Sequence, residues 1–218
     1  AANTTGQKNI AIGWLALDNA DTESGNIAIG VSALGGPING GIQNIAIGNN
    51  SLDANTSGIN QVALGYDALS DNTTGNYNIA IGHSSLERNT VGNGNTAIGY
   101  ASLFINTAGN NNTASGYSAL YGNTTGNDNT ASGMEALKNN TEGDKNTAAG
   151  YRALYNNTEG DDNTAFGYNS LYVNTTGIRN IAIGRAALGN ADTENDNLAI
   201  GHDALGGAIA GGEKNLAI

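Results

Sequence analysis

Acidic side chains gather in three short segments of the chain, and they are the first candidates for chemistry. The segments contain Glu142 and Asp144, then Glu159, Asp161 and Asp162, then Asp192, Glu194 and Asp196. Carboxylate oxygens in loops are ligands that calcium favours. However, the G-G-x-G-x-D pattern of calcium-binding β-rolls is absent. We therefore predict solvated charges at the corners of the fold and no metal site.

Other reactive groups are scarce in this chain. It contains no cysteine and two histidines, His83 and His202, which occupy the same position in two distant repeats. No nucleophile elbow, phosphate-binding loop or zinc-ligand spacing appears in the sequence. We therefore expect that the chain is not an enzyme and needs no cofactor.

Aromatic side chains recur at the sixth position of a sequence repeat that is described below. Five of these residues are tyrosines, namely Tyr66, Tyr100, Tyr117, Tyr151 and Tyr168. The tenth position adds Phe104, Tyr121, Tyr155 and Tyr172. A ladder of exposed tyrosines presents apolar rings and hydroxyls together, which suits a host-cell glycan or another partner surface. Alternatively, the same rings pack between chains or cover their own coil.

The element that must position all these side chains is a 17-residue repeat, N-x-A-x-G-x-x-[AS]-L-x-x-N-T-x-G-x-x. Such a period indicates stacked structural units that each contact only their neighbours. We expect one continuous array over residues 1–218, with partial repeats at 1–8 and 215–218. Full repeats start at Asn9, Asn26, Asn44, Gln61, Asn78, Asn95, Asn112, Asn129, Asn146, Asn163, Asn180 and Asn197.

A second, longer period is present in the same array. The repeats that start at Asn26 and Asn197 have 18 residues and carry the related inserts GGPINGG and GGAIAGG. The repeats just before them also match, as NIAIGWLALDNADTESG and NIAIGRAALGNADTEND. A tandem duplication explains this pattern, and we expect the chain to be a window on a longer array.

The repeat predicts β-structure, because glycine, asparagine and threonine are frequent in it and helical periodicity is absent. We predict a strand of about four residues at N-x-A-x-G, a second strand around [AS]-L-x-x, and a corner at N-T-x-G. One coil per repeat would stack identical residues into ladders. The core ladder includes Leu86, Leu103, Leu120, Leu137 and Leu154, and a corner ladder includes Asn95, Asn112, Asn129 and Asn146. The asparagines either satisfy backbone groups in the corner or simply favour turns.

The apolar content of one coil is small, and this bears on the oligomeric state. Each repeat offers one invariant leucine and two small residues for 17 ordered positions, so burial against other chains would help it fold. This favours a homotrimer, while a monomeric solenoid and an intertwined three-chain spiral remain alternatives. The second and fourth positions alternate with the alanine, so we expect them to face outward or toward another chain.

Composition limits the partners. The net charge is −11, and nucleic acid is an unfavourable partner because phosphate contacts need lysine and arginine. The chain has no run of 18 apolar residues, so we expect no membrane insertion by this segment.

The motif N-[IT]-A-[IS]-G, as in residues 95–99, resembles the head repeats of trimeric autotransporter adhesins. The resemblance covers nearly the whole chain and implies a left-handed parallel β-roll of three chains, located outside the cell. Similar arrays with N-T-T-G resemble segments of phage-like tail fibres and large bacterial surface proteins. The adhesin repeats are usually shorter and lack the N-T-x-G corner, and we expect neither the coiled-coil stalk nor the membrane-anchoring barrel of the adhesins within this segment.

The function that we expect is an extracellular structural and adhesive fibre segment that binds cells or surfaces by repeated contacts. A tail-fibre shaft is one alternative. An ice-binding solenoid is another, because the threonine of N-T-x-G recurs from Thr56 to Thr175.

Overall fold

The chain forms a parallel β-solenoid in the computed structural model, which describes residues 5–19, 22–207 and 211–218. The chain divides into two compact units, Ala1–Asn110 and Asn111–Ile218. No helix occurs in the described ranges. The all-β parallel solenoid with about 17 residues per coil, which the repeat predicted, is confirmed.

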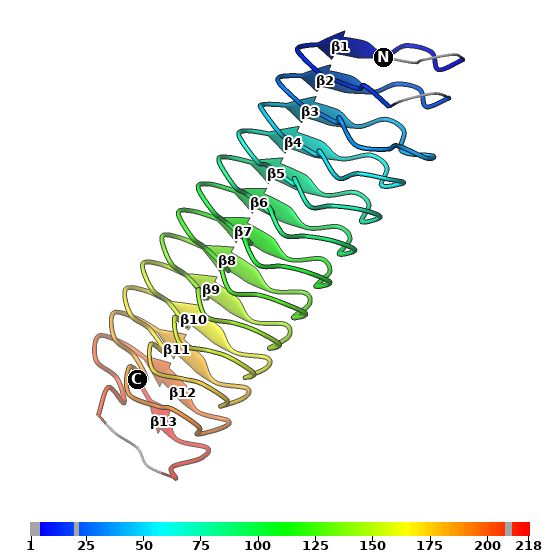
Figure 1. Cartoon of the computed structure of the whole chain (residues 1–218). Coiled ribbons are helices and arrows are strands. Elements are labelled where there is room, and N and C mark those ends of the chain that lie inside the picture. Colours follow the sequence, from blue (N-terminus) through cyan, green and yellow to red (C-terminus); the bar gives the residue numbers. More distant parts are fainter. Residues whose placement is uncertain (1–4, 20–21, 208–210) are drawn as a thin grey trace. The chain divides into compact units, whose positions relative to one another are not determined.

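Each coil of the first unit contributes one short strand (Figure 1). These strands are β1 (Ile10–Ile12), β2 (Ile27–Ile29), β3 (Ile45–Ile47), β4 (Val62–Leu64), β5 (Ile79–Ile81) and β6 (Thr96–Ile98). Consecutive strands pair in parallel, with equivalent residues of successive repeats side by side. For example, Ala63 pairs with Ala80.

The second unit repeats the same arrangement. Its strands are β7 (Thr113–Ser115), β8 (Thr130–Ser132), β9 (Thr147–Ala149), β10 (Thr164–Phe166), β11 (Ile181–Ile183), β12 (Leu198–Ile200) and β13 (Leu216–Ala217). They also pair in parallel and in register, as Thr130 does with Thr147. Because the repeat length sets the register, every repeat position becomes a column of equivalent side chains within its unit.

The core of each unit consists of three columns inside a single chain. The alanine at position three is completely buried from Ala28 to Ala199, and position eight supplies buried alanine or serine. The leucine at position nine fills the remaining space. Fully buried leucines include Leu86 and Leu103 in the first unit and Leu120, Leu137 and Leu154 in the second.

The segment around the core leucine is a turn, and the expected second strand is therefore wrong. Every leucine at position nine has a left-handed backbone, with φ between 49° and 55°. Position seven is also left-handed in every repeat, with φ between 50° and 57°. Two left-handed residues that flank one other residue bend the chain sharply, which no strand can do. The bend aims the leucine inward and turns the chain toward the corner.

The inserts lengthen the corner rather than the strand. In GGPINGG the side chain of Ile38 is buried, with 6% exposed, and the N–H of Asn39 donates to the carbonyl of Thr56 in the next coil. The pairing of β2 with β3 stays in register in spite of the extra residue. The equivalent insert GGAIAGG falls partly outside the described residues, since 208–210 are not among them.

Candidate interaction surfaces

Buried asparagines at position one hold the corner from which exposed side chains project. The Nδ2 of Asn129 donates to the carbonyl of Gly143 (2.7 Å), and its Oδ1 accepts the N–H of Asn146 in the next coil (2.9 Å). The N–H of Asn129 in turn donates to Oδ1 of Asn112 (3.0 Å). Asn95 in the first unit is buried in the same way. Each asparagine therefore joins its own corner to the neighbouring strand.

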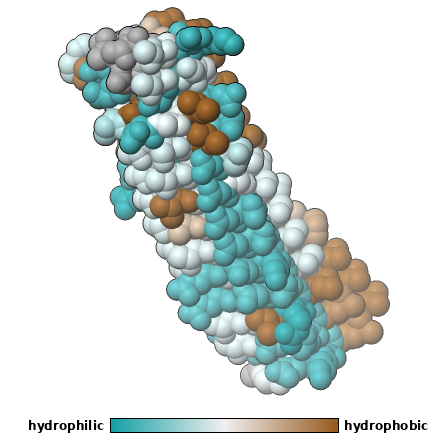
Figure 2. Space-filling view, turned by 90° about the vertical axis from the view of Figure 1, so that its right-hand side faces the viewer, coloured by the Kyte–Doolittle hydropathy of each residue, from teal (hydrophilic) through white to brown (hydrophobic). Residues whose placement is uncertain are grey.

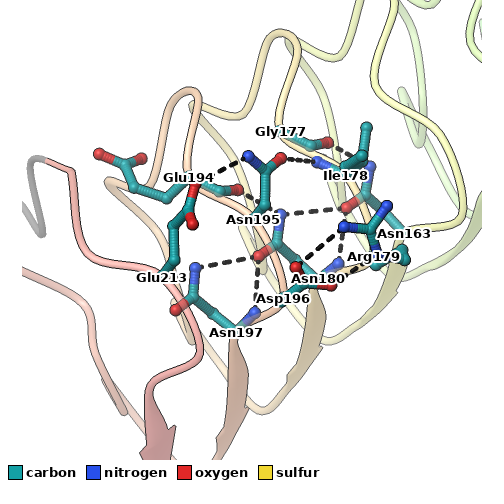
Figure 3. Close-up of polar contacts among 10 residues, drawn as sticks. All are labelled: Asn163, Gly177, Ile178, Arg179, Asn180, Glu194, Asn195, Asp196, Asn197 and Glu213. Atoms are coloured by element: carbon teal, nitrogen blue, oxygen red, sulfur yellow. Dashed lines mark hydrogen bonds and ion pairs between the residues drawn. The ribbon is translucent and has the colours of Figure 1, made fainter.

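Figure 3 shows this column near the C-terminal end of the second unit. The N–H and the Nδ2 of Asn197 both donate to Oδ1 of Asn180, each at 3.1 Å. Asn180 makes the same pair of bonds to Asn163, at 2.9 and 3.2 Å. Its Nδ2 also donates to the carbonyl of Glu194 (2.7 Å).

A second buried asparagine column lies at position twelve, which the ladder prediction did not include. The Nδ2 of Asn140 donates to Oδ1 of Asn123 (2.8 Å) and to the carbonyl of Gly143 (2.9 Å). Its own Oδ1 accepts from Nδ2 of Asn157 in the next coil (2.7 Å). The recurrence of the N-T-x-G asparagine in eight successive repeats is the signal for this column. Turn propensity alone does not account for it, because these side chains are completely buried.

The acidic segments do not all form solvated corner charges, which corrects that prediction. Oδ1 of Asp144 accepts the N–H of Asn127, and Oδ1 of Asp161 accepts the N–H of Asp144, each at 2.7 Å. These carboxylates take the place of asparagines that do the same in other coils. Their oxygens therefore satisfy the backbone rather than form a ligand set.

Glu194 is buried, with 7% exposed. It stands where other repeats have the glycine of N-T-x-G, and Ala191 stands where they have the asparagine. Its Oε2 accepts the N–H groups of Asp192 (2.7 Å) and Thr193 (3.1 Å), and its Oε1 accepts the N–H of Gly211 (3.2 Å). Glutamate thus replaces the missing asparagine, and the Gly-rich insert of the next coil supplies a donor.

Another acidic residue of that segment, Asp196, pairs with arginine on the surface. Asp196 holds Arg179 through two hydrogen bonds, at 2.6 and 2.9 Å. The bond from Arg179 lowers the pKa of Asp196. Both side chains are solvent-accessible, so the pair organises the corner and adds little to stability.

The position-six column is largely exposed, and it stacks aromatic rings from successive coils. In the first unit His83 stacks between Tyr66 and Tyr100, with ring centroids 5.0 and 5.3 Å apart. In the second unit Tyr151 stacks on Tyr168 at 5.2 Å. Tyr117 and Met134 belong to the same column of the second unit, and each is about half exposed.

The position-ten column lies beside the first and joins it through charged side chains. Tyr155 stacks on Tyr172, with centroids 5.3 Å apart. The guanidinium of Arg152 lies 5.0 Å from the ring of Tyr151 and 5.2 Å from that of Tyr155. Glu135 fixes Arg152 with a 2.6 Å contact.

Lys138 completes this cluster from the other side of the glutamate. Its Nζ lies 2.7 Å from Oε1 of Glu135 and 5.7 Å from the ring of Tyr155. The hydrogen bond from Lys138, supported by that from Arg152, lowers the pKa of Glu135. The cluster is therefore an aromatic and charged surface in which Glu135 holds both cationic side chains.

The outer face of the first unit's sheet is aliphatic. Positions two and four point away from the buried alanine, and Ile12, Ile47 and Ile81 are 59%, 39% and 37% exposed. Thr113, Ser115, Thr130 and Ser132 occupy these positions in β7 and β8 of the second unit. The expectation of outward-facing positions is correct. Figure 2 shows a hydrophilic band on another face, with hydrophobic side chains gathered beside its lower part.

The threonines of the N-T-x-G corner use their hydroxyls within the fold. Oγ1 of Thr73 donates to the carbonyl of Thr90, and Oγ1 of Thr141 to that of Thr158, at 2.9 and 3.0 Å. Equivalent bonds occur in neighbouring coils of both units. These hydroxyls form hydrogen bonds between adjacent corners. The threonines that the fold could present outward on a flat face, as an ice-binding solenoid would need, are therefore those at position two.

Among the described residues there is no group of three or more His, Cys, Asp or Glu side chains that could hold a metal ion. Within the same part of the chain, no helix is long and apolar enough to cross a membrane. Comparison of the chain with models of protein families, with curated proteins and with solved structures gave no match.

Proposed function

We propose that this chain is a non-enzymatic segment of an extracellular fibre that binds cells or surfaces through many weak, repeated contacts. The observation that supports the proposal most is the columnar surface. The same backbone presents equivalent exposed side chains coil after coil, as in the stack of Tyr66, His83 and Tyr100. A ligand that is itself repeated meets several equivalent positions at once, and linked sites gain avidity from effective concentration.

Surface binding tests this function. Beads that carry the chain at increasing density should bind host cells more steeply than in proportion to density, because contacts become multivalent. The matched control is a triple variant, Tyr66→Ser, His83→Ser and Tyr100→Ser, which removes one exposed stack and leaves the core leucines in place. The proposal is contradicted if binding stays proportional to the density of the chain on the beads, or if beads without the chain bind the cells equally well.

The fibre that we propose is a homotrimer of left-handed β-rolls. The aliphatic face of the first unit supports self-association, because positions two and four carry no charged residue in any repeat of a chain with net charge −11. Two copies of the chain can pack together through the uncharged side chains at these positions, whereas the acidic remainder of the surface would repel a second copy of the chain. A large exposed apolar surface commonly marks an interface.

Light scattering tests the assembly. We expect a mass near three times 22.0 kDa for the soluble chain. The variant Ile45→Thr, Val62→Thr and Ile79→Thr should shift the mass toward that of one chain, because threonine occupies the same position in β6 to β10 without disturbing the strands. A monomer mass for the unmodified chain contradicts the trimer, but leaves surface binding open.

A further inference from the structure

We propose that the cavity beside Tyr172 in the second unit is a binding subsite for a single saccharide ring. The proposal rests on the adhesive function above and names a ligand class and a place for it. The cavity measures about 230 Å³. Pockets for drug-sized molecules measure about 300–1,000 Å³, so this one suits one small ring.

The cavity exists because the position-ten aromatic column ends there. Tyr155 and Tyr172 stack with centroids 5.3 Å apart, so one face of Tyr172 is covered by the preceding coil. The next two coils have Gly189 and Gly206 at this position, and both glycines line the cavity. The other face of Tyr172 therefore borders a space that an aromatic side chain occupies in earlier coils. A flat, partly apolar ring in that space would continue the stack.

Polar groups surround the same space. Asp203 and Asn190 line the cavity, and both residues are exposed. Asn169 also lines it, and its Oδ1 is buried without a hydrogen-bond partner. If the amide of Asn169 turns toward a ligand hydroxyl, this oxygen gains a partner and loses none. An orphaned buried acceptor is costly, so such a bond favours a bound ligand that can donate.

This combination selects the chemistry of the ligand. A pyranose ring places C–H groups against an aromatic face and directs hydroxyl donors sideways, toward amide and carboxylate oxygens. A purely aromatic ligand would stack on Tyr172 but would leave those acceptors unused. No cationic side chain lines the cavity, and Asp203 disfavours an anion. We therefore assign the subsite to neutral or amino sugars.

Ligand-detected NMR on the whole soluble chain tests the assignment. The probes are methyl glucopyranoside, methyl galactopyranoside, N-acetylglucosamine and glucosamine, with p-cresol as an aromatic probe. One small ring in an open site should bind with a Kd on the order of 1 mM. At least one sugar should bind, and p-cresol should bind more weakly than that sugar.

Three variants locate the binding. Gly189→Tyr fills the space with the side chain that three earlier coils carry at this position, and it should abolish binding. Tyr172→Ala should weaken binding roughly tenfold, because the stacking face is lost. Tyr77→Ala removes an exposed ring of the first unit that lies outside both aromatic columns, and it should leave the affinity unchanged. Circular dichroism checks that each variant keeps its β-structure.

The outcomes separate this proposal from the adhesive function. The saccharide subsite is wrong if no sugar binds at about 10 mM, if only p-cresol binds, or if Gly189→Tyr binds as the unmodified chain does. Density-dependent adhesion of coated beads in any of those cases would preserve the proposed function. Sugar binding without adhesion would preserve the subsite and contradict the function.

Discussion

Replacing Gly133 with alanine is expected to destabilise its coil by about 3 kcal/mol or more. Gly133 is the position-five glycine after β8, and its φ of 128° lies in a region that L side chains rarely adopt. A Cβ built there would lie 2.7 Å from the carbonyl oxygen of Gly150 in the next coil. Strain and collision therefore act together, and the colliding group is backbone that cannot turn away.

Amide hydrogen exchange is the measurement suited to this prediction. A stack of repeats can open locally, so one global unfolding free energy need not describe it. Exchange should accelerate at Gly133 and Gly150, whose N–H groups donate to Ser115 and Ser132 at 2.8 Å. An increase of about a hundredfold corresponds to roughly 3 kcal/mol.

The matched control is Gly207→Ala. Nothing lies within 4 Å of a Cβ built on Gly207, and its φ is outside the left-handed region. This substitution should change stability by less than about 0.5 kcal/mol. Equal exchange rates in the Gly133→Ala variant and the unmodified chain would show that coils can separate enough to admit a Cβ.

The coil length and the strand position could be predicted because both follow from spacing. Identical residues every 17 positions can stack only if each repeat makes one coil, and N-x-A-x-G alternates as a strand must. The burial of Ala131 and Leu137 agrees with that logic. Residue spacing does not determine the number of chains or the hand of the coil. The same spacing lets one chain close its own core whether it is single or assembled, and whether the coil is left-handed or right-handed.

The turn at the core leucine was missed because leucine rarely adopts a left-handed backbone. A signal for it was nevertheless present. Positions seven and nine and the last position of the repeat contain no Val, Ile or Thr in any repeat, although these residues are common at positions two, four and thirteen. All non-glycine residues with positive φ lie at those three positions. β-Branched side chains are the least tolerant of this conformation, so their absence marks it.

The candidate surfaces were predicted in kind but not in detail. The column of tyrosines at position six follows from the repeat spacing, whereas the cavity beside Tyr172 depends on what the next coil lacks. Gly189 and Gly206 carry no side chain that would signal this space in the sequence. Only the stack of Tyr155 on Tyr172 shows that these glycines open a space at the end of an aromatic column.

The second large effect is expected for Asn140, in the position-twelve column. Asn140→Ala should cost at least about 2 kcal/mol, since it removes three hydrogen bonds between buried groups. These bonds join Asn140 to Oδ1 of Asn123, to the carbonyl of Gly143 and to Nδ2 of Asn157. Asn140→Asp keeps the shape but replaces a double donor with a carboxylate that faces two oxygens. At pH 7 it should cost about 4 kcal/mol or more.

The two variants should respond differently to pH, and the direction follows from the geometry. Burial and the facing oxygens raise the folded-state pKa of the introduced aspartate above its unfolded value of about 3.9. Below the unfolded pKa the acid is protonated in both states, so the charge costs nothing and its O–H can donate to Gly143. As pH rises toward the folded-state pKa, the cost of ionisation grows and then levels off. Asn140→Asp should therefore be at least as stable as Asn140→Ala near pH 3 and clearly less stable at pH 7.

Urea unfolding near pH 3 and at pH 7 measures this change in the relative stability of the two variants. The control is Asn139→Asp. Asn139 is the adjacent, half-buried residue, and its Nδ2 makes a 3.2 Å bond to Asn156. The Asn139→Asp substitution introduces the same charge outside the buried column. The free energy of unfolding of this variant should therefore stay within about 0.5 kcal/mol of that of the unmodified chain. If the Asn140→Asp and Asn140→Ala variants are equally stable at pH 7, the column tolerates a charge and does not hold the corners as we describe. Glu194 shows why it should not: its buried carboxylate faces three backbone N–H groups, whereas the partners of the Asn140 Nδ2 are two acceptor oxygens.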